Sequence, residues 1–162
     1  MKKILITESK FRSLGVEPGV LHAVVALNAL GFPTSGSCEG HSEESPYPWI
    51  LFVTKQKKKS DKLDFNAWGK KTGKFIQSLE ILLSGFYADR DVPLDQKLVV
   101  QYELNVTPFA FFKLQCAGAE TLSLLPSEIF GSKARASILA RHQKEMKDFA
   151  VFLKKHWKRN PR

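Results

Sequence analysis

The chain has 162 residues, of which 43% are hydrophobic and 25% charged, a balance that excludes an intrinsically disordered protein. This length suits one compact domain with its own core, so we expect a single domain over residues 1–162. The formal net charge of +9 favours an anionic partner, nucleic acid above all, although excess lysine also serves plain solubility.

The cysteine content and the hydropathy of the sequence indicate the cellular compartment. Cys38 and Cys116 are too few for a disulfide framework, and no secretory signal pattern follows Met1. The longest apolar runs are interrupted or fall well short of the roughly 20 residues that a membrane helix needs. We therefore expect a reducing, cytoplasmic location and no membrane span.

The first predicted element is a helix over residues 18–30. Pro18 suits the first helical position, and Gly31 provides a natural stop. Between them, apolar residues recur at helical spacing, at Val20, Val24 and Leu27. A polar connection follows, and residues 49–53 then form an apolar, β-favouring run that predicts a central strand.

The second half of the chain predicts two more helices around a hairpin. A long helix is expected from about Asp61 to Phe86, with Ser60 or Asp61 as its N-cap. Residues 98–104 and 109–116 alternate as the two strands of a hairpin, and an apolar stripe over 138–153 predicts a last helix. A basic tail is expected from about residue 154. The predicted fold is α+β, with a small, mainly antiparallel sheet packed by about three helices.

The candidate functional segment is the connection from Thr34 to His41. Cys38 and His41 stand three residues apart, a spacing that lets one turn aim a thiol and an imidazole at a common metal ion such as zinc. Further ligands would come from the remaining cysteine, histidines and nearby glutamates, namely Cys116, His22, His142, Glu43 and Glu44. Cys116 and His142, however, lie on apolar faces where a core role is commoner.

The same pair also suits nucleophilic catalysis. An imidazolium beside a thiol lowers the thiol pKa, so Cys38 can act as nucleophile and His41 as base, with Glu39 or Glu43 orienting the ring and Ser37 as a rival nucleophile. The glycine-bracketed loop offers backbone and hydroxyl donors for an anionic substrate, at Thr34, Ser35 and Ser37. A plain tight turn, in which these hydroxyls satisfy the local backbone, is the alternative.

Aromatic and basic residues next to this segment predict substrate contacts. Tyr47 and Trp49 can stack on bases, and a lysine run can contact phosphates, at Lys57, Lys58 and Lys59. Solvated lysines and core aromatics are the alternative interpretation.

The segment 34–41 resembles the Thr-x-Ser-Ser-Cys-Ser-Gly-Arg signature of the methyltransferase family that acts in tRNA wybutosine synthesis. The preceding helix with Asn28, and the strand from Pro108 to Cys116, are similar to the same family. In this chain His41 stands where the signature has Arg, and Gly36 and Glu39 each replace a Ser. The Ser-Cys-Glu-Gly-His core is also similar to bacterial and phage proteins for which no function is implied.

The family resemblance implies an α+β fold, S-adenosylmethionine as cofactor, RNA as substrate and the Cys38 loop at the active cleft. Three functions stay open: a nucleic-acid-associated, RNA-modifying protein; a thiol- or metal-dependent enzyme acting on a small molecule; and a non-catalytic interaction module.

Overall fold

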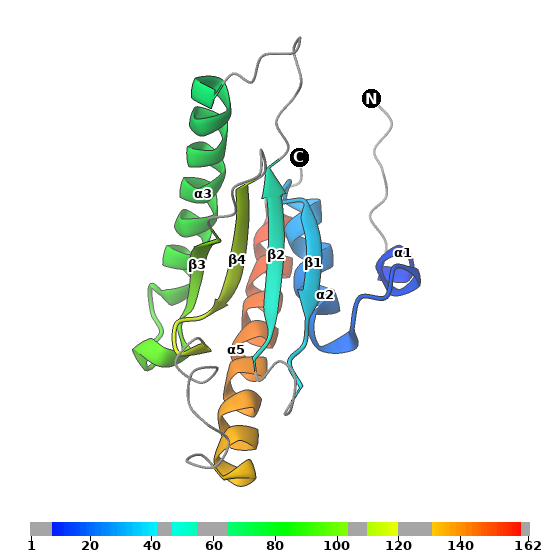
Figure 1. Ribbon diagram of the computed structural model, residues 1–162, viewed down its shortest axis with the longest axis vertical. Helices are drawn as coiled ribbons and strands as arrows, with labels where there is room; N and C mark the ends of the chain where they lie inside the picture. The colour runs from blue at the N-terminus through cyan, green and yellow to red at the C-terminus, as the bar shows by residue number, and fades with distance from the viewer. Residues whose placement is uncertain (1–7, 42–46, 55–64, 104–109, 120–130, 160–162) are drawn as a thin grey trace.

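The computed structural model describes residues 8–41, 47–54, 65–103, 110–119 and 131–159 (Figure 1). Within them the chain forms four α-helices, a short 3-10 helix and a four-stranded sheet: α1 (Glu8–Ser13), α2 (Pro18–Ala29), β1 (Thr34–Cys38), β2 (Trp49–Thr54), α3 (Phe65–Tyr87), η1 (Leu94–Gln96), β3 (Leu98–Glu103), β4 (Ala110–Cys116) and α5 (Ser132–Arg159). The expected α+β fold is confirmed, with four described helices in place of about three.

The sheet is antiparallel throughout, with strand order β1-β2-β4-β3. The expected hairpin is confirmed, since β3 pairs with β4 from Leu98 opposite Cys116 to Glu103 opposite Phe111. Strand β4 also pairs with β2, which places the two most apolar strands in the centre. The outer position falls to β1, whose only partner among the described strands is β2.

Strand β1 corrects the expected loop at 34–41. Residues 34–38 pair with β2, with an irregularity between Thr34 and Gly36. The side chain of Asn28 fixes the start of this strand, because its Nδ2 donates to Thr34 Oγ1 at 2.8 Å and its Oδ1 accepts the Thr34 N–H at 3.3 Å. A segment of turn-forming residues is therefore held extended by its neighbours and by the end of α2.

One face of the sheet carries the core. Alternate residues of the central strands, Ile50, Phe52, Phe112 and Leu114, are fully buried and belong to one cluster with residues of α2, α3 and α5. The ring of Phe75 in α3 lies 5.5 Å from that of Phe52, centroid to centroid. Helices α2 and α5 thus lie behind the sheet, as Figure 1 shows, and the opposite face carries residues of the other parity.

The helix boundaries confirm most of the periodicity and correct one detail. Helix α2 begins at Pro18 as expected, and Gly31 adopts a φ of +92° just beyond its end. The last helix is longer than its apolar stripe, because α5 continues to Arg159, so residues 154–159 are helical and not a separate tail. No helix in the described part of the chain has the length and apolarity to cross a membrane.

Several expectations lie outside the described residues. These are the N-cap at Ser60 or Asp61, the lysine run, the acidic ligands Glu43 and Glu44, and the hairpin turn at 104–109.

Candidate functional site

Three side chains of different chemistry converge at the end of β1. The thiol of Cys38, the imidazole of His41 and the carboxylate of Glu17 each offer a ligand atom, and these atoms all lie within 4.8 Å of one another. His41 Nε2 is 2.7 Å from Glu17 Oε1. The expected Cys38 and His41 pair is therefore brought together, and a carboxylate just before α2 completes it.

Reciprocal hydrogen bonds tie this end of the strand to the start of α2. The Glu39 N–H donates to Glu17 Oε2 at 2.6 Å, while the Glu39 carboxylate accepts the Gly19 N–H at 2.6 Å. A carboxylate at a helix N-terminus satisfies an orphan donor and meets the positive end of the helix dipole. Glu39 thus positions the segment, and its carboxylate belongs to the helix start and not to the cluster.

A turn at Gly40 brings His41 back towards Glu17. Gly40 has a φ of +85°, and a Cβ there would lie 2.7 Å from Leu139 Cδ1 and 2.8 Å from the Tyr47 carbonyl carbon. Only glycine combines this backbone conformation with so close an approach. Helix α5 supports the turn as well, because Gln143 Nε2 donates to the Glu39 carbonyl at 3.0 Å.

The electrostatics keep the Glu17 carboxylate ionised. Burial opposes its ionisation, but the Glu39 N–H, the His41 imidazole and the Cys38 thiol all hydrogen-bond to it, so its pKa is lowered from 4.5. The Cys38 sulfur in turn accepts the Gly40 N–H at 3.3 Å. Glu17 therefore lies between the thiol and the imidazole and contacts both.

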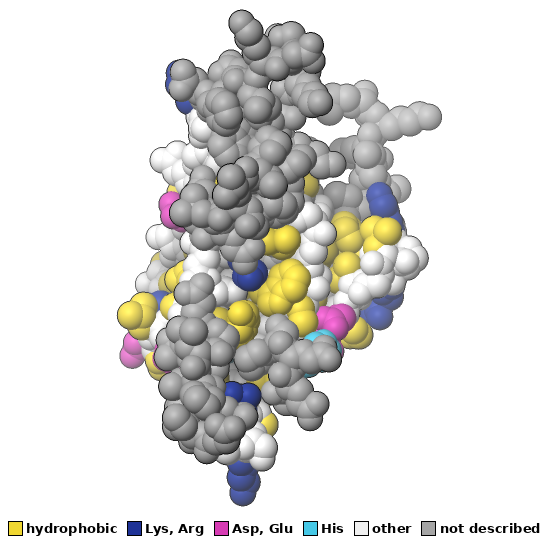
Figure 2. Space-filling model, viewed as in Figure 1, with side chains coloured by type: hydrophobic (Ala, Val, Ile, Leu, Met, Phe, Trp, Pro, Cys, Tyr) yellow, Lys and Arg dark blue, Asp and Glu magenta, His cyan; other side chains and the backbone are white. Residues whose placement is uncertain are grey.

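Solvent reaches this cluster from one side. The side chain of His41 is 49% exposed and that of Glu17 is 31% exposed, while Cys38 is half-buried. Figure 2 shows an acidic and a histidine side chain together at the margin of a hydrophobic patch on the face turned away from the helices. Ligands that share such an edge can accept an ion or a small molecule from solution.

Aromatic and basic groups lie beside the cluster on that face. Cys38 pairs with Trp49 in the register of β1 and β2, and paired residues share a face of the sheet. Lys113 Nζ of β4 lies 5.6 Å from the Trp49 ring centroid. Trp49 is thus brought to the site as expected. Tyr47 contributes backbone contacts at Gly40, and Lys57, Lys58 and Lys59 lie outside the described residues.

The expected hydroxyl contacts do not gather around Cys38. Thr34 binds Asn28 at the far end of β1, and Ser35 Oγ donates to the Leu51 carbonyl at 3.3 Å. All three residues also line one hollow of about 240 Å³, together with Leu14, Gly15 and Val16 of the α1–α2 connection. The Thr34 and Ser35 hydroxyls hold the strand in place, and the expected anion cradle at Thr34, Ser35 and Ser37 stays a prediction, at a hollow that Cys38 does not line.

The other expected ligands lie elsewhere. Cys116 is fully buried on the helical side of the sheet, where burial, with Glu145 and Asp95 nearby, raises the pKa of its thiol to about 12. His142 is fully buried in α5. His22 lies on the surface of α2, with Nδ1 at 3.0 Å from Glu8 Oε1. The core interpretation of Cys116 and His142 is confirmed.

Glu17 is the site residue that the sequence did not suggest. Its signal is its place immediately before Pro18, which marks it as the residue at the helix N-terminus.

No family model, curated protein or solved structure matches the chain. The resemblance to the wybutosine-synthesis methyltransferases therefore stays an expectation.

Proposed function

We propose that the chain is a metal-dependent enzyme acting on a small molecule, with a zinc-class ion held by Glu17, Cys38 and His41. The convergence of their three ligand atoms within 4.8 Å of one another carries this proposal. Carboxylate oxygen, thiolate sulfur and imidazole nitrogen are the ligand types that zinc takes in proteins. Three protein ligands at an exposed edge leave a fourth position for water or substrate, as in catalytic zinc sites.

The charges favour a metal over a cysteine nucleophile. The Cys38 thiol hydrogen-bonds to the ionised Glu17 carboxylate. A neighbouring negative charge disfavours the thiolate that a nucleophile requires. A divalent cation reverses this effect, because it compensates one thiolate and one carboxylate and leaves a neutral site with a neutral His41. Bound zinc would supply a water of lowered pKa, the nucleophile of metal-dependent hydrolysis.

Calorimetric titration with zinc at pH 7 tests the site. We expect one zinc ion to bind per chain and the Cys38 thiol to release a proton on binding. Cys38→Ser should lower the zinc affinity at least about 100-fold, because losing a direct ligand costs more than losing an outer-shell group, which costs roughly 10- to 100-fold. Cobalt in place of zinc should show a thiolate charge-transfer band that Cys38→Ser removes.

The chain contains a matched control pair. His22 and Glu8 form a similar exposed contact at 3.0 Å with no cysteine in the cluster. We expect His22→Ala and Glu8→Gln to bind zinc as the parent does, while His41→Ala and Glu17→Gln bind weakly. Hydrolysis in a panel of ester, amide and phosphoester substrates should be lost on chelation and in Cys38→Ser. Unchanged zinc affinity in Cys38→Ser, or no zinc-dependent turnover in the panel, would contradict the proposal.

A second candidate function is association with single-stranded RNA. The observation that favours it is the Trp49 ring beside Cys38 with Lys113 Nζ at 5.6 Å, since aromatic rings and cations together bind bases and phosphates. Binding of a labelled single-stranded RNA should weaken steeply with salt as counterions are released. Affinity that does not change with salt, or that survives Trp49→Ala intact, would remove this candidate.

A further inference from the structure

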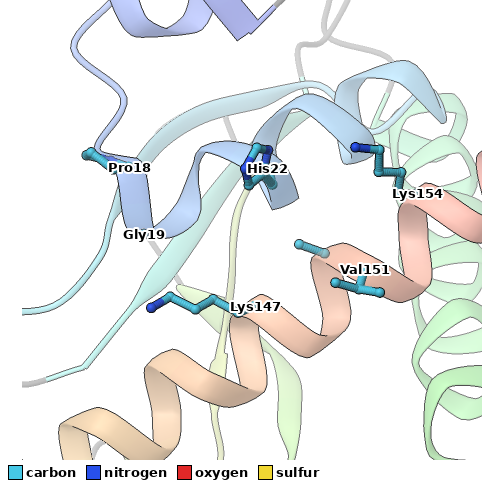
Figure 3. A pocket seen from close by; sticks show the side chains of 7 residues that line it. Pro18, Gly19, His22, Lys147, Val151 and Lys154 are labelled. Atoms are coloured by element: carbon cyan, nitrogen blue, oxygen red, sulfur yellow. The ribbon is translucent and has the colours of Figure 1, made fainter.

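A second concave region lies between α2 and α5 and is lined by these two helices. It is a hollow of about 300 Å³ bounded by the start of α2 and by one face of α5. The lining residues are Pro18, Gly19, His22, Lys147, Ala150, Val151 and Lys154. Figure 3 shows the two lysine side chains reaching from α5 towards α2 and ending on either side of His22.

The lysines of this hollow have no acidic partner in the described part of the chain. Lys147 and Lys154 stand seven residues apart, which places them on one face of α5. Lys144, one turn away, differs because its Nζ is 2.7 Å from Asp148 Oδ2. Two cations that line one hollow both attract an anion bound between them.

The remaining lining narrows the class of anion. The start of α2 offers little by itself, since the Gly19 N–H is already bound by the Glu39 carboxylate. Recognition of charge therefore falls to the lysines, with His22 held beside them by Glu8 at 3.0 Å. The floor is apolar, formed by the buried Ala150 and by Val151, and would suit a carbon skeleton.

We propose that this hollow binds the phosphate group of a small phosphorylated molecule, of the size of a sugar phosphate. Its volume of about 300 Å³ lies at the lower end for ligand pockets, and two helices bound it on two sides. A nucleic-acid backbone would instead need an open, continuous groove. Lys147 and Lys154 hold the phosphate, and the floor at Val151 contacts the rest of the ligand. This site does not depend on the metal proposed at Cys38.

Calorimetric titration with ribose 5-phosphate, at low ionic strength and without metal, tests the proposal. We expect ribose 5-phosphate to bind and ribose not to bind. Lys147→Gln and Lys154→Gln should each weaken binding roughly 10-fold, the effect of one charged hydrogen bond. Val151→Glu should abolish binding, because it places a carboxylate in the floor. Val151 is 56% exposed, so this variant should fold.

Two controls separate this site from its neighbours. Lys70→Gln removes an exposed lysine from α3 and should leave the affinity unchanged. Cys38→Ser should also bind ribose 5-phosphate normally, so that failure of the metal site and failure of this site are distinguishable. The proposal is overturned if Lys147→Gln, Lys154→Gln and Val151→Glu all bind as the parent does. It is equally overturned if a single-stranded oligonucleotide binds through these lysines while ribose 5-phosphate does not.

Discussion

Replacing Gly40 by alanine should destabilise the protein by about 2–5 kcal/mol. A left-handed backbone costs an L-residue roughly 1–2 kcal/mol, and forcing a methyl group into a packed space adds about 1–3 kcal/mol. Both terms apply at Gly40, where φ is +85° and a Cβ would lie 2.8 Å from the Tyr47 carbonyl carbon and 2.9 Å from the Pro48 nitrogen. These are backbone atoms, which cannot rotate away as the end of a side chain can.

Two other glycines distinguish the backbone cost from the steric cost. Gly15 has a φ of +80°, and a Cβ at this position would meet no atom within 4 Å, so Gly15→Ala should carry the backbone cost alone, about 1–2 kcal/mol. Gly73 lies within α3 with open space around it, and Gly73→Ala should stabilise the helix by about 0.5–1 kcal/mol. The three variants are thus expected to differ in sign as well as in size.

Urea unfolding followed by circular dichroism gives the free energy of unfolding for each variant. A Gly40→Ala variant that loses no more stability than Gly15→Ala would refute the close approach of Gly40 to Tyr47 and Pro48. Zinc titration of the same samples adds a functional readout. Because His41 follows Gly40 directly, Gly40→Ala should weaken zinc binding, whereas Gly73→Ala should not.

Two further predictions concern buried polar groups near the end of the sheet. The ring of His142 is fully buried, and this burial lowers its pKa from 6.5 although the neighbouring Asp95 opposes the shift. The unfolded chain therefore binds the proton more readily, and the free energy of unfolding should fall as the pH drops below 6.5. Urea unfolding at pH 7 and pH 5 should show a smaller drop in His142→Leu, and an equal drop would contradict this assignment. Arg90→Met should cost about 3–5 kcal/mol because it leaves the buried Glu145 carboxylate without its cation, now 2.7 Å away. Glu145→Gln should cost less in the same assay, since Arg90 keeps Asp148 at 3.4 Å; the reverse order would argue against this pairing.

Periodicity predicted the long elements because their apolar residues face one core. The stripe over 138–153 and the alternation in 98–104 and 109–116 both reflect burial on a single side, and the described parts of these segments are helix or strand as expected. Helix α1 was not predicted because none of its six residues is buried, so its sequence carries no apolar pattern. Strand β1 escaped because Thr-Ser-Gly-Ser-Cys is rich in turn formers, and its extended form depends on pairing with β2 and on Asn28.

The cluster of Glu17, Cys38 and His41 depends on the lengths of α2 and β1, and strand β1 was not predicted from the sequence. Helix α2 has 12 residues and β1 has five, so each spans roughly 17–18 Å, and the short connection between them returns Cys38 to the level of Glu17. Side chains alternate along an extended chain, so Cys38 faces the side of Trp49 while Glu39 faces the start of α2. Glu39 was predicted to be catalytic because it is adjacent to Cys38 in sequence. In an extended chain, however, adjacent side chains point to opposite faces, so the Glu39 side chain points away from the Cys38 thiol. The carboxylate that meets the thiol comes instead from 21 positions earlier, where β1 ends beside the helix that precedes it.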